Sequence, residues 1–417
     1  MNRVKLGDIL QIKHGYAFKS ENYVEKSPYA LVTLANISGS NNFQFTPDKT
    51  TYYGAAFPDE FKLYEDDLIM PLTEQVVGLF GNSAFVPKIN GIQFVLNQRV
   101  GKVIPIEEKA DKYYLHYLLS TDIVRDQLEY RASGTRQRNI SPNDVYDVTV
   151  FIPDINIQRK IGKTLYDLER KINLNNQIND NLQHQIKLLY DYWFTQFDFP
   201  DENGKPYRAS GGAMVWNEEL KREIPAGWDV YNLGEHCDIL LGGTPDTSKN
   251  EYWNGTINWL NSGEVSQFPV VSSELRITQA GLDNSATKLM PANTVVVSIT
   301  GNIRASILAI DTCANQSVVG ILESDDLKSQ YIYPYMCNLL THYTSISTGN
   351  CQQHINKGTI EDSLILLPNK DTLKKYYLKT EFLYNQITNN ALEIQKLTAL
   401  RDWLLPMLMN SQATISD

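Results

Sequence analysis

The chain has 417 residues, which is too long for one ordinary domain and predicts two or three. Hydrophobic residues make up 42% and charged residues 21%, a composition typical of a soluble globular protein, and no apolar run approaches the roughly 18 residues of a membrane span. The formal net charge of −10 argues against a general polyanion binder, although it leaves room for nucleic-acid binding through local positive charge.

Residues 1–152 are expected to form a mixed α/β domain with more strand than helix. Val95 to Val103 is a short apolar run with β-branched residues, which predicts a strand. Tyr113 to Leu128 has helical spacing, and Val148 to Ile152 predicts a buried strand that ends at a proline. Near the start, Lys13 to Tyr16 contains a glycine that permits close backbone approach, so this segment is either a binding loop or a plain turn.

A second polar segment, Arg131 to Ile140, contains one glycine and many side chains that can read DNA. Arginine can bond guanine through two hydrogen bonds, and glutamine or asparagine can bond adenine in the same way. The alternative is an ordinary solvated loop, and we favour binding because a polar loop recurs at the same place in the second half. Positive charge gathers around this segment at Arg125, Arg131, Arg136 and Arg138, against Asp126 and Glu129.

The segment 153–197 predicts a long helix with one buried stripe. Apolar residues and two asparagines recur in alternating steps of four and three, which is typical of a coiled coil. The stripe comprises positions 161, 165, 168, 172, 175, 179, 182, 186, 189 and 193. Residues 198–227 are rich in Pro, Gly, Asp and Ser, and this composition predicts a linker.

The second half repeats this organisation, with a mixed domain at 228–369 and a helix at 370–410. Thr294 to Ile299 and Leu364 to Leu367 predict strands, and Gln330 to Tyr343 has helical spacing. The polar loop of this half is Ser347 to Lys357, and the glycine segment is Gly242 to Pro245. Acidic residues outnumber basic ones between 229 and 328, so the two halves are not expected to bind DNA with equal electrostatic strength.

The two halves are diverged copies of one module. Gly15 follows Leu6-Gly7 by eight positions, as Gly242 follows Leu233-Gly234. From Gly134 onward the register is constant at an offset of 215, over some sixty residues without a gap. Matched pairs include Gly134 and Gly349, Gln137 and Gln352, Ile140 and Ile355, Pro153 and Pro368, and Leu182 and Leu397.

The same offset places an asparagine on both helical stripes, at Asn175 and Asn390. If a pseudo-two-fold axis relates the copies, the helices run antiparallel as a coiled coil, and we expect Asn175 and Asn390 to hydrogen-bond across the seam. A buried seam asparagine lowers stability but fixes register and partner choice. The alternative is that both asparagines lie just off the seam in solvent. A helix of about 33 residues spans roughly 50 Å, more than one turn of B-DNA, which suits a divided target.

No catalytic signature is present. The sequence lacks a phosphate-binding loop, a dinucleotide-binding glycine motif, HExxH and a nucleophile elbow. Pro58 to Lys62 and Pro153-Asp154 resemble nuclease motifs only superficially and are interpreted as turns. The cysteines at 237, 313, 337 and 351 lack the spacing of a zinc site. We therefore expect no enzyme activity, no metal and a reducing cytoplasmic location.

Several motifs together resemble the specificity (S) subunit of type I restriction–modification systems. Ile224 to Trp228, Leu233 to Glu235 and Gly242 to Pro245 are similar to the opening of a target recognition domain in that family. Each half closes with Gly-x-x-Gln-x-x-Ile, a proline and a long helix, and the stretch from Tyr190 to Trp216 resembles the central region of the family. The first half departs from the pattern because it begins without a Pro-x-Gly-Trp lead-in.

The resemblance implies an α+β fold with two target recognition domains, at 1–152 and 228–369. Each would read one half of a bipartite site in double-stranded DNA, with 153–197 and 370–410 as helical spacer regions and docking surface. It also implies two adenine-methylating modification subunits that bind S-adenosylmethionine, and restriction subunits that use ATP and Mg²⁺, so that no cofactor belongs to this chain. The alternative is a two-headed protein scaffold that reads no DNA.

The candidate DNA-contacting residues of the first half are Lys13, His14, Tyr16, Lys19, Gln98, Arg99, Arg131, Thr135, Arg136, Gln137, Arg138 and Asn139. Those of the second half are Thr244, Lys249, Arg304, Gln316, Asn350, Gln352, Gln353, His354 and Lys357. The candidate helix-pairing residues are Asn175 and Asn390.

Overall fold

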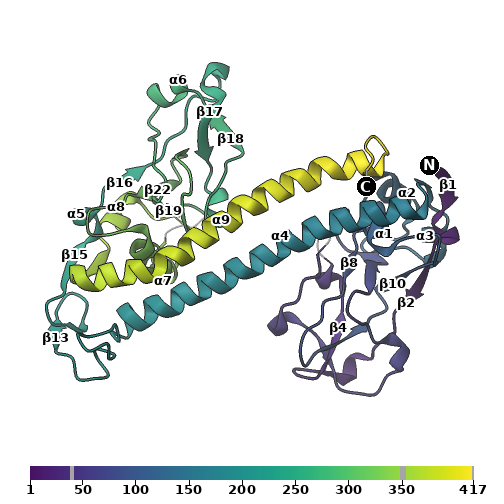
Figure 1. The fold of residues 1–417 in the computed structure, drawn as a ribbon, viewed down its shortest axis with the longest axis horizontal. Helices are drawn as coiled ribbons and strands as arrows, with labels where there is room; N and C mark the ends of the chain where they lie inside the picture. Colours follow the sequence, from purple (N-terminus) through teal and green to yellow (C-terminus); the bar gives the residue numbers. More distant parts are fainter. Residues whose placement is uncertain (38–41, 348–353, 416–417) are drawn as a thin grey trace. The chain divides into compact units, whose positions relative to one another are not determined.

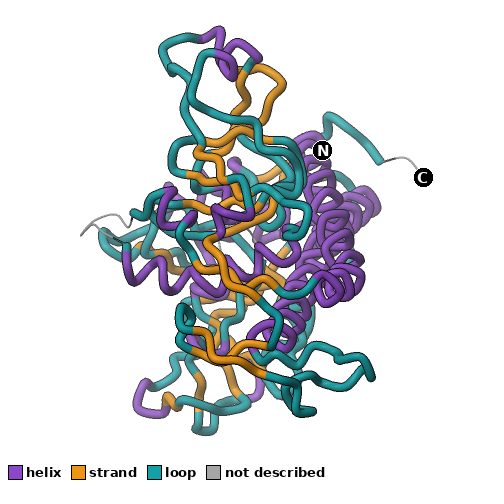
Figure 2. The backbone as a smooth tube through the Cα atoms, turned by 90° about the vertical axis from the view of Figure 1, so that its left-hand side faces the viewer, coloured by secondary structure: helices purple, strands orange, loops and turns teal. Residues whose placement is uncertain are grey.

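The computed structural model of the chain describes residues 1–37, 42–347 and 354–415 (Figure 1). Contacts divide it into two compact units. Unit 1 comprises Met1–Arg170 with Thr398–Asp417, and unit 2 comprises Lys171–Leu397. Short strands alternate with long loops in both (Figure 2). Among the described residues, no helix is both long and apolar enough to cross a membrane.

Unit 1 contains a four-stranded antiparallel sheet in the order β2-β10-β6-β8. These strands are β2 (Leu10–His14), β10 (Val100–Pro105), β6 (Leu68–Pro71) and β8 (Ala84–Phe85). A second sheet has the order β3 (Tyr23–Val24), β5 (Tyr52–Tyr53), β4 (Tyr29–Val32) and β9 (Gln93–Leu96). Two further pairs join β1 (Asn2–Lys5) to β12 (Thr149–Ile152) and β7 (Thr73–Glu74) to β11 (Arg138–Asn139). The apolar run predicted as one strand over 95–103 is therefore two strands with a turn between them.

Helices α1 and α3 of unit 1 begin where a polar side chain satisfies one of the first free backbone N–H groups. The Asp111 carboxylate accepts from the backbone N–H of Tyr114 at the start of α1 (Lys112–Leu119). Ser141 caps α3 (Pro142–Tyr146), which has proline at its first position. Helix α2 (Asp122–Arg131) follows α1 after a break at Ser120 and Thr121, so the single helix predicted over 113–128 is two helices.

Unit 2 repeats this arrangement. Its four-stranded antiparallel sheet has the order β16 (Ile239–Leu241), β22 (Val318–Ile321), β19 (Val295–Ser298) and β20 (Ala305–Ile307). A three-stranded sheet has the order β18 (Leu275–Ile277), β17 (Trp253–Leu260) and β21 (Thr312–Ala314), and β15 (Asp229–Asn232) pairs with β23 (Leu364–Leu367). The helices are α5 (Leu233–His236), α6 (Gln279–Asp283), α7 (Ser329–Ile346) and α8 (Lys357–Glu361).

The matching strand order confirms the duplication. Strands β2, β10, β6 and β8 correspond in order to β16, β22, β19 and β20, and the parallel pair β4–β9 corresponds to β17–β21. Helix α3 begins at residue 142 and α8 at residue 357, which keeps the offset of 215 read from the sequence. The chain is therefore two mixed α/β domains, each followed by a long helix.

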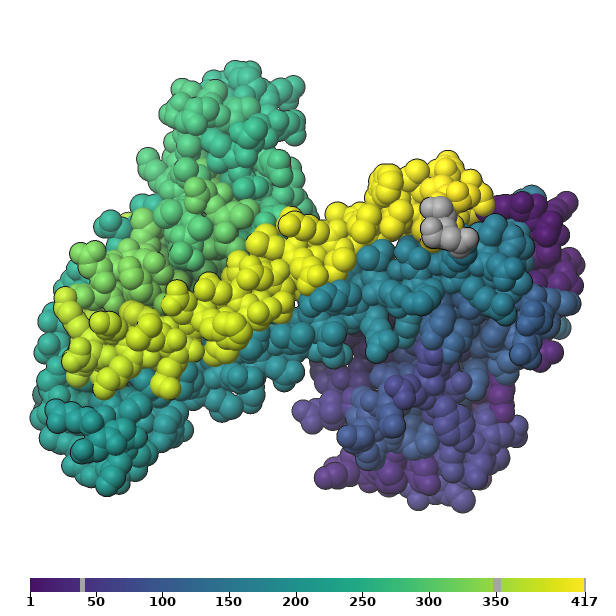
Figure 3. All heavy atoms as spheres, viewed as in Figure 1, coloured from purple at the N-terminus to yellow at the C-terminus, as the bar shows by residue number. Residues whose placement is uncertain are grey.

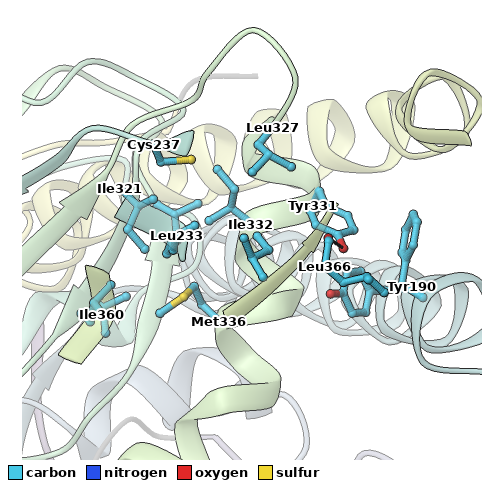
Figure 4. Close-up of a cluster of buried hydrophobic side chains, with 14 of the residues drawn as sticks. Tyr190, Leu233, Cys237, Ile321, Leu327, Tyr331, Ile332, Met336, Ile360 and Leu366 are labelled. Carbon is cyan, nitrogen blue, oxygen red and sulfur yellow. Dashed lines mark hydrogen bonds between the residues drawn. The ribbon is translucent and has the colours of Figure 1, made fainter. Parts of the chain in front are cut away.

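The residues between the two copies fold as part of unit 2, although their composition is typical of a linker. They contain a hairpin of β13 (Met214–Asn217) and β14 (Arg222–Pro225). Phe199 and Ile224 are buried in the same core as Tyr190, Tyr331 and Leu366. Figure 4 shows that core, in which the Tyr331 hydroxyl donates to the carbonyl oxygen of Leu366 at 2.6 Å.

Two long helices, α4 (Ile155–Tyr190) and α9 (Lys370–Met409), contribute to both units. Every position of the predicted stripe, in both helices, is buried or half-buried. In unit 2, Asn175 of α4 faces Glu393 of α9, and Asn179 faces Asn390, so the helices pair antiparallel. In unit 1, Ile161 and Leu165 of α4 share a core with Leu408 and Met409 of α9. Figure 3 shows the side chains of α9 packed along α4.

The seam asparagines are buried as predicted, but the predicted bond between Asn175 and Asn390 is wrong. Asn390 Nδ2 donates to Asn179 Oδ1 at 2.9 Å, and Asn175 Nδ2 donates to Glu393 Oε2 at 2.7 Å. Asn175 and Asn390 occupy equivalent positions, so they would meet only if the symmetry point of the seam lay at Asn175 itself. The observed register puts that point two residues further along, close to Gln177 and Leu392, and each asparagine therefore faces a non-equivalent residue.

Candidate nucleic-acid interface

Four segments of unit 1 that are distant in sequence are joined in series by backbone hydrogen bonds. Tyr16 N donates to Leu96 O at 2.9 Å, and Gln98 N donates to Tyr16 O at 3.0 Å. The next links are Leu72 N to Arg99 O at 2.9 Å and Ile140 N to Leu72 O at 3.0 Å. The glycine segment, the β9–β10 turn, strand β7 and the polar loop predicted from the sequence therefore lie side by side.

Unit 2 has a corresponding series, in which three of the four bonds are equivalent to those of unit 1. Gly242 N donates to Val318 O at 3.0 Å, and Gly243 N donates to Ala314 O at 2.8 Å. Ile299 N then donates to Ser317 O at 2.9 Å, and Ile355 N donates to Ile299 O at 3.0 Å. Both copies thus bring together their glycine segment, a tight turn, the end of the third sheet strand and the polar loop. We call this four-segment arrangement the reading edge of each unit, after the DNA-reading role that the sequence predicts for its glycine segment and polar loop.

Close backbone contact explains the glycine in each first segment. A Cβ added at Gly15 would lie 2.0 Å from the carbonyl oxygen of Asn97, and one added at Gly242 would lie 2.1 Å from that of Asn315. Neither contact can be relieved by moving a flexible side chain, because both involve backbone atoms. The glycines are therefore required to form the edge, whatever else the segments bind.

Equivalent side chains also cross-link the third and fourth segments. In unit 1, Thr73 Oγ1 donates to Asn139 Oδ1 at 2.9 Å. In unit 2, Thr300 Oγ1 and His354 Nδ1 lie 3.1 Å apart. The threonine is common to both copies while its partner differs, so the backbone of the edge is kept and the chemistry of the polar loop changes.

The predicted arginines of the unit 1 loop have different environments. Arg138 is half-buried and engaged within unit 1: its Nη1 lies 2.9 Å from Oε1 of the buried Glu74, and its Nη2 donates to Glu129 O at 2.8 Å. Arg131 donates to the carbonyl oxygens of Gln127 and Asp147 near the end of α2. These two side chains therefore have structural partners within unit 1.

Other predicted residues are exposed on this edge. Gln98 and Arg99 occupy the β9–β10 turn, and Thr135, Arg136 and Asn139 belong to the polar loop. Among the described residues, no side-chain partner contacts the guanidinium group of Arg99 or of Arg136. Gln137 is half-buried and its Nε2 donates to Asn139 Oδ1 at 3.3 Å. The edge of unit 1 therefore presents two available guanidinium groups together with side-chain amides.

The predicted residues close to Tyr16 are partly engaged elsewhere. Lys13 Nζ lies 3.0 Å from Glu60 Oε2 and above the ring of Phe61. Lys19 lies 3.9 Å from Glu21, and His14 is exposed at the end of β2. Tyr16 is half-buried and packs edge-on against Phe18, so its ring supports the segment.

In unit 2, Thr244 Oγ1 donates to Gln316 Oε1 at 2.5 Å, which joins the first two segments of the edge. Arg304 and His354 are exposed. Lys357 pairs with Glu361 within α8. Lys249 lies over the ring of Tyr252, and the tyrosine hydroxyl accepts a hydrogen bond from the lysine and raises its pKa. Asn350, Gln352 and Gln353 lie outside the described residues.

Thr73, Glu74 and Thr300 also belong to this edge, although the sequence pattern does not predict them as site residues. The signal was available for the threonines, because the offset of 227 that relates Gly15 to Gly242 also relates Thr73 to Thr300. Glu74 gave no signal, since its partner Arg138 is 64 positions away and the pairing depends on the fold.

An alternative to this edge would be a site made of other residues, and one such cavity lies in unit 2. A cavity of about 670 Å³ in unit 2 is lined by residues of α7 and α9 together with Phe268 and Ile307, and none of the predicted reading residues line it. In the part of the chain that the structure describes, no three His, Cys, Asp or Glu side chains are grouped so that they could hold a metal ion.

Comparison with known families gives one match over most of the chain. The family described as "Type I restriction modification DNA specificity domain" matches residues 1–184 and 225–399. The two matched ranges contain the two reading edges, and each extends into the long helix that follows.

Individual relatives agree with that match. The chain is 23% identical over 372 residues to the type I restriction enzyme HindI specificity subunit of Haemophilus influenzae, covering 75% of this chain and 80% of that protein. It is 24% identical over 328 residues to the MjaIX specificity subunit of Methanocaldococcus jannaschii, covering 77% and 73%. A crystal structure of the S subunit from M. genitalium has a TM-score of 0.63 at 14% identity, covering 98% of this chain and 95% of that one, which shows a shared fold.

Proposed function

The chain belongs to the type I restriction modification DNA specificity family, and we propose that it reads a two-part DNA target with one recognition domain on each half. The observation that carries this proposal is the repeated reading edge. The two copies share three equivalent backbone hydrogen bonds and the threonine of that edge, whereas the exposed side chains differ. One architecture with two sets of polar side chains is what reading two different half-sites requires.

Local charge supports DNA as the ligand in spite of the net charge of −10. Arg99 and Arg136 are exposed on the edge of unit 1, while the neighbouring carboxylate of Glu74 is buried and paired. Positive groups without an acidic partner attract phosphates and release their counterions. We infer that unit 1 supplies more of the electrostatic attraction than unit 2, whose Lys357 is already paired with Glu361.

We further propose that the chain performs no bond chemistry itself and docks two modification subunits and the restriction subunits. S-adenosylmethionine, ATP and Mg²⁺ would then bind to those partners. The paired helices α4 and α9 would set the unread gap between the half-sites, because their stripes are fixed in register by buried asparagines.

The test uses the chain assembled with its modification subunits. Methylation-site mapping in the host first identifies the two-part target. The double variant Arg99→Ala, Arg136→Ala is then expected to bind that target about tenfold or more weakly, with a slope of log affinity against log salt that is lower by about two.

Arg3→Ala is the matched control, since Arg3 is an exposed arginine on β1, outside the reading edge. It should change neither the affinity nor the salt slope. If the double variant instead fails to assemble while its DNA affinity is unchanged, the chain acts as a protein scaffold and the proposal is wrong.

A further inference from the structure

The connection between β6 and β8 carries two neighbouring valines into solvent. Val76 is 79% exposed and Val77 is 68% exposed, on the segment from Gln75 to Leu79 that we call the valine loop. Single apolar side chains are common on protein surfaces, but two adjacent β-branched residues at the tip of a loop expose a continuous apolar surface.

This loop is fixed at its base. The Glu74 carboxylate is 1% exposed, and its Oε2 accepts from the backbone N–H groups of Leu79 at 3.0 Å and Phe80 at 3.2 Å. Phe80 is fully buried. Gly81 has a φ of +85°, and a Cβ there would lie 2.6 Å from the carbonyl oxygen of Leu119. The buried Glu74 carboxylate and the tight backbone at Gly81 therefore fix the base of the loop, and the valines extend from it into solvent.

The valine loop adjoins the reading edge of unit 1. Strand β7, which ends at Glu74, pairs with β11, so Glu74 faces Arg138 across the ladder. The ion pair between them ties the loop to the polar segment that also carries the exposed Arg136. Leu72, two residues before Glu74, accepts and donates the backbone bonds that hold the edge together.

Unit 2 has a different surface at the equivalent place. Its β19–β20 connection is only Ile299 to Arg304, closed by Ser298 Oγ, which donates to Asn302 O and accepts from Arg304 N. Asn302 and Arg304 are exposed there. The equivalent connection therefore has an apolar tip in unit 1 and a polar tip in unit 2.

We propose that the valine loop contacts thymine methyl groups in the major groove of the half-site that unit 1 reads. This inference rests on the proposed function and adds a reader that forms no hydrogen bonds. In the major groove, the C5-methyl of thymine is the apolar feature, and small apolar side chains recognise it by contact. The guanidinium groups on the same edge draw the phosphates in, which brings the valines against the bases.

The experiment compares Val76→Ser, Val77→Ser with the native chain, each assembled with its modification subunits. Binding is measured to the mapped target and to duplexes in which uracil replaces thymine in one half-site at a time. Uracil removes only the C5-methyl group. We expect the native complex to lose about fourfold in affinity for each methyl contact removed, and the double variant to bind thymine DNA about tenfold more weakly.

The decisive result is that uracil in that half-site causes no further loss in the double variant. Val215→Ser is the control, because Val215 is an exposed valine of the β13–β14 hairpin and should change nothing. The inference is overturned if uracil weakens native and variant equally, if it weakens neither, if the half-site has no thymine, or if the variant fails to assemble. Absence of any two-part target for the native complex would refute the proposed function instead.

Discussion

At the scale of single residues, one buried carboxylate joins a recognition domain to its long helix. Glu169 of α4 is 5% exposed, and its Oε2 lies 2.8 Å from the Tyr117 hydroxyl and 3.5 Å from His116 Nε2. His116 Nδ1 lies 2.8 Å from Ser83 Oγ. Burial acts to raise the pKa of Glu169, but the hydrogen bond and charge of His116, together with Tyr117 and Arg401, outweigh it and lower the pKa.

This pKa shift predicts acid sensitivity of unit 1. A carboxyl whose pKa is lower in the folded state contributes stability that is present above its ordinary value of 4.5 and is lost as pH falls through the folded pKa. Glu169→Gln should therefore lower the melting temperature at pH 7 and flatten its decline between about pH 5 and pH 3. Thermal denaturation across that range measures both effects.

The control is Asp167→Asn, because Asp167 lies on the same helix with its side chain 53% exposed in an ion pair with Lys163. Removing an exposed pair should cost little. If the Glu169→Gln protein kept the native pH profile, the interactions of the Glu169 carboxylate with His116 and Tyr117 would not contribute to the stability of unit 1.

At the scale of elements, local patterns were predicted well and those set by distant partners were not. The strand predicted at Leu364 to Leu367 has the observed bounds, because a continuous apolar run before a proline is a local signal. The turn within Val95 to Val103 was missed, since it forms where Tyr16 pairs with the chain beside Asn97. Phe199 is buried in a segment of linker-like composition, because the aromatic core of unit 2 accepts it.

The helical seam gives a prediction of its own. Asn390 Nδ2 donates to Asn179 Oδ1, and Asn179 Nδ2 donates to Ile387 O. Replacing only Asn390 with Leu leaves Asn179 without a partner for its oxygen and should cost about 1–3 kcal/mol. Replacing both with Leu should restore most of the native stability, because an apolar pair fills the buried seam and only the half-buried Gln386, whose Nε2 donates to Asn390 Oδ1, loses its acceptor.

Chemical denaturation of the two single variants and the double variant yields the coupling energy between the positions. Asn181→Leu controls for the change in helix propensity, since Asn181 is exposed on α4 and its amide donates to the carbonyl oxygen of Gln177 within the same helix. Simple additivity of the two single effects would contradict the pairing.

At the scale of the whole molecule, the sequence identified the family and the segments of the reading edge but not the state of each side chain. Family, repeat and polar loop are all visible as spacing along the chain. The roles of Arg138 and Arg99 are not visible in this way. Arg138 pairs with a buried carboxylate contributed by β7, whereas Arg99 lies exposed in the β9–β10 turn. Two arginines in equally polar sequence therefore differ in availability only once the strands have paired.

The proposed spacer role of the helices predicts how the target changes when they are lengthened. Inserting three heptads after Gln177 and three after Leu392 keeps both stripes in phase and adds about 31 Å at 1.5 Å per residue. That length is close to one turn of B-DNA, about 34–36 Å, so the reading loops return to nearly the same face of the duplex. The unread gap mapped from methylation sites should grow by about nine to ten base pairs.

A single heptad in both helices adds only about 10 Å and turns the next half-site away from its reader, so methylation should fall sharply. An unchanged gap in the longer protein would mean that the helices do not set it.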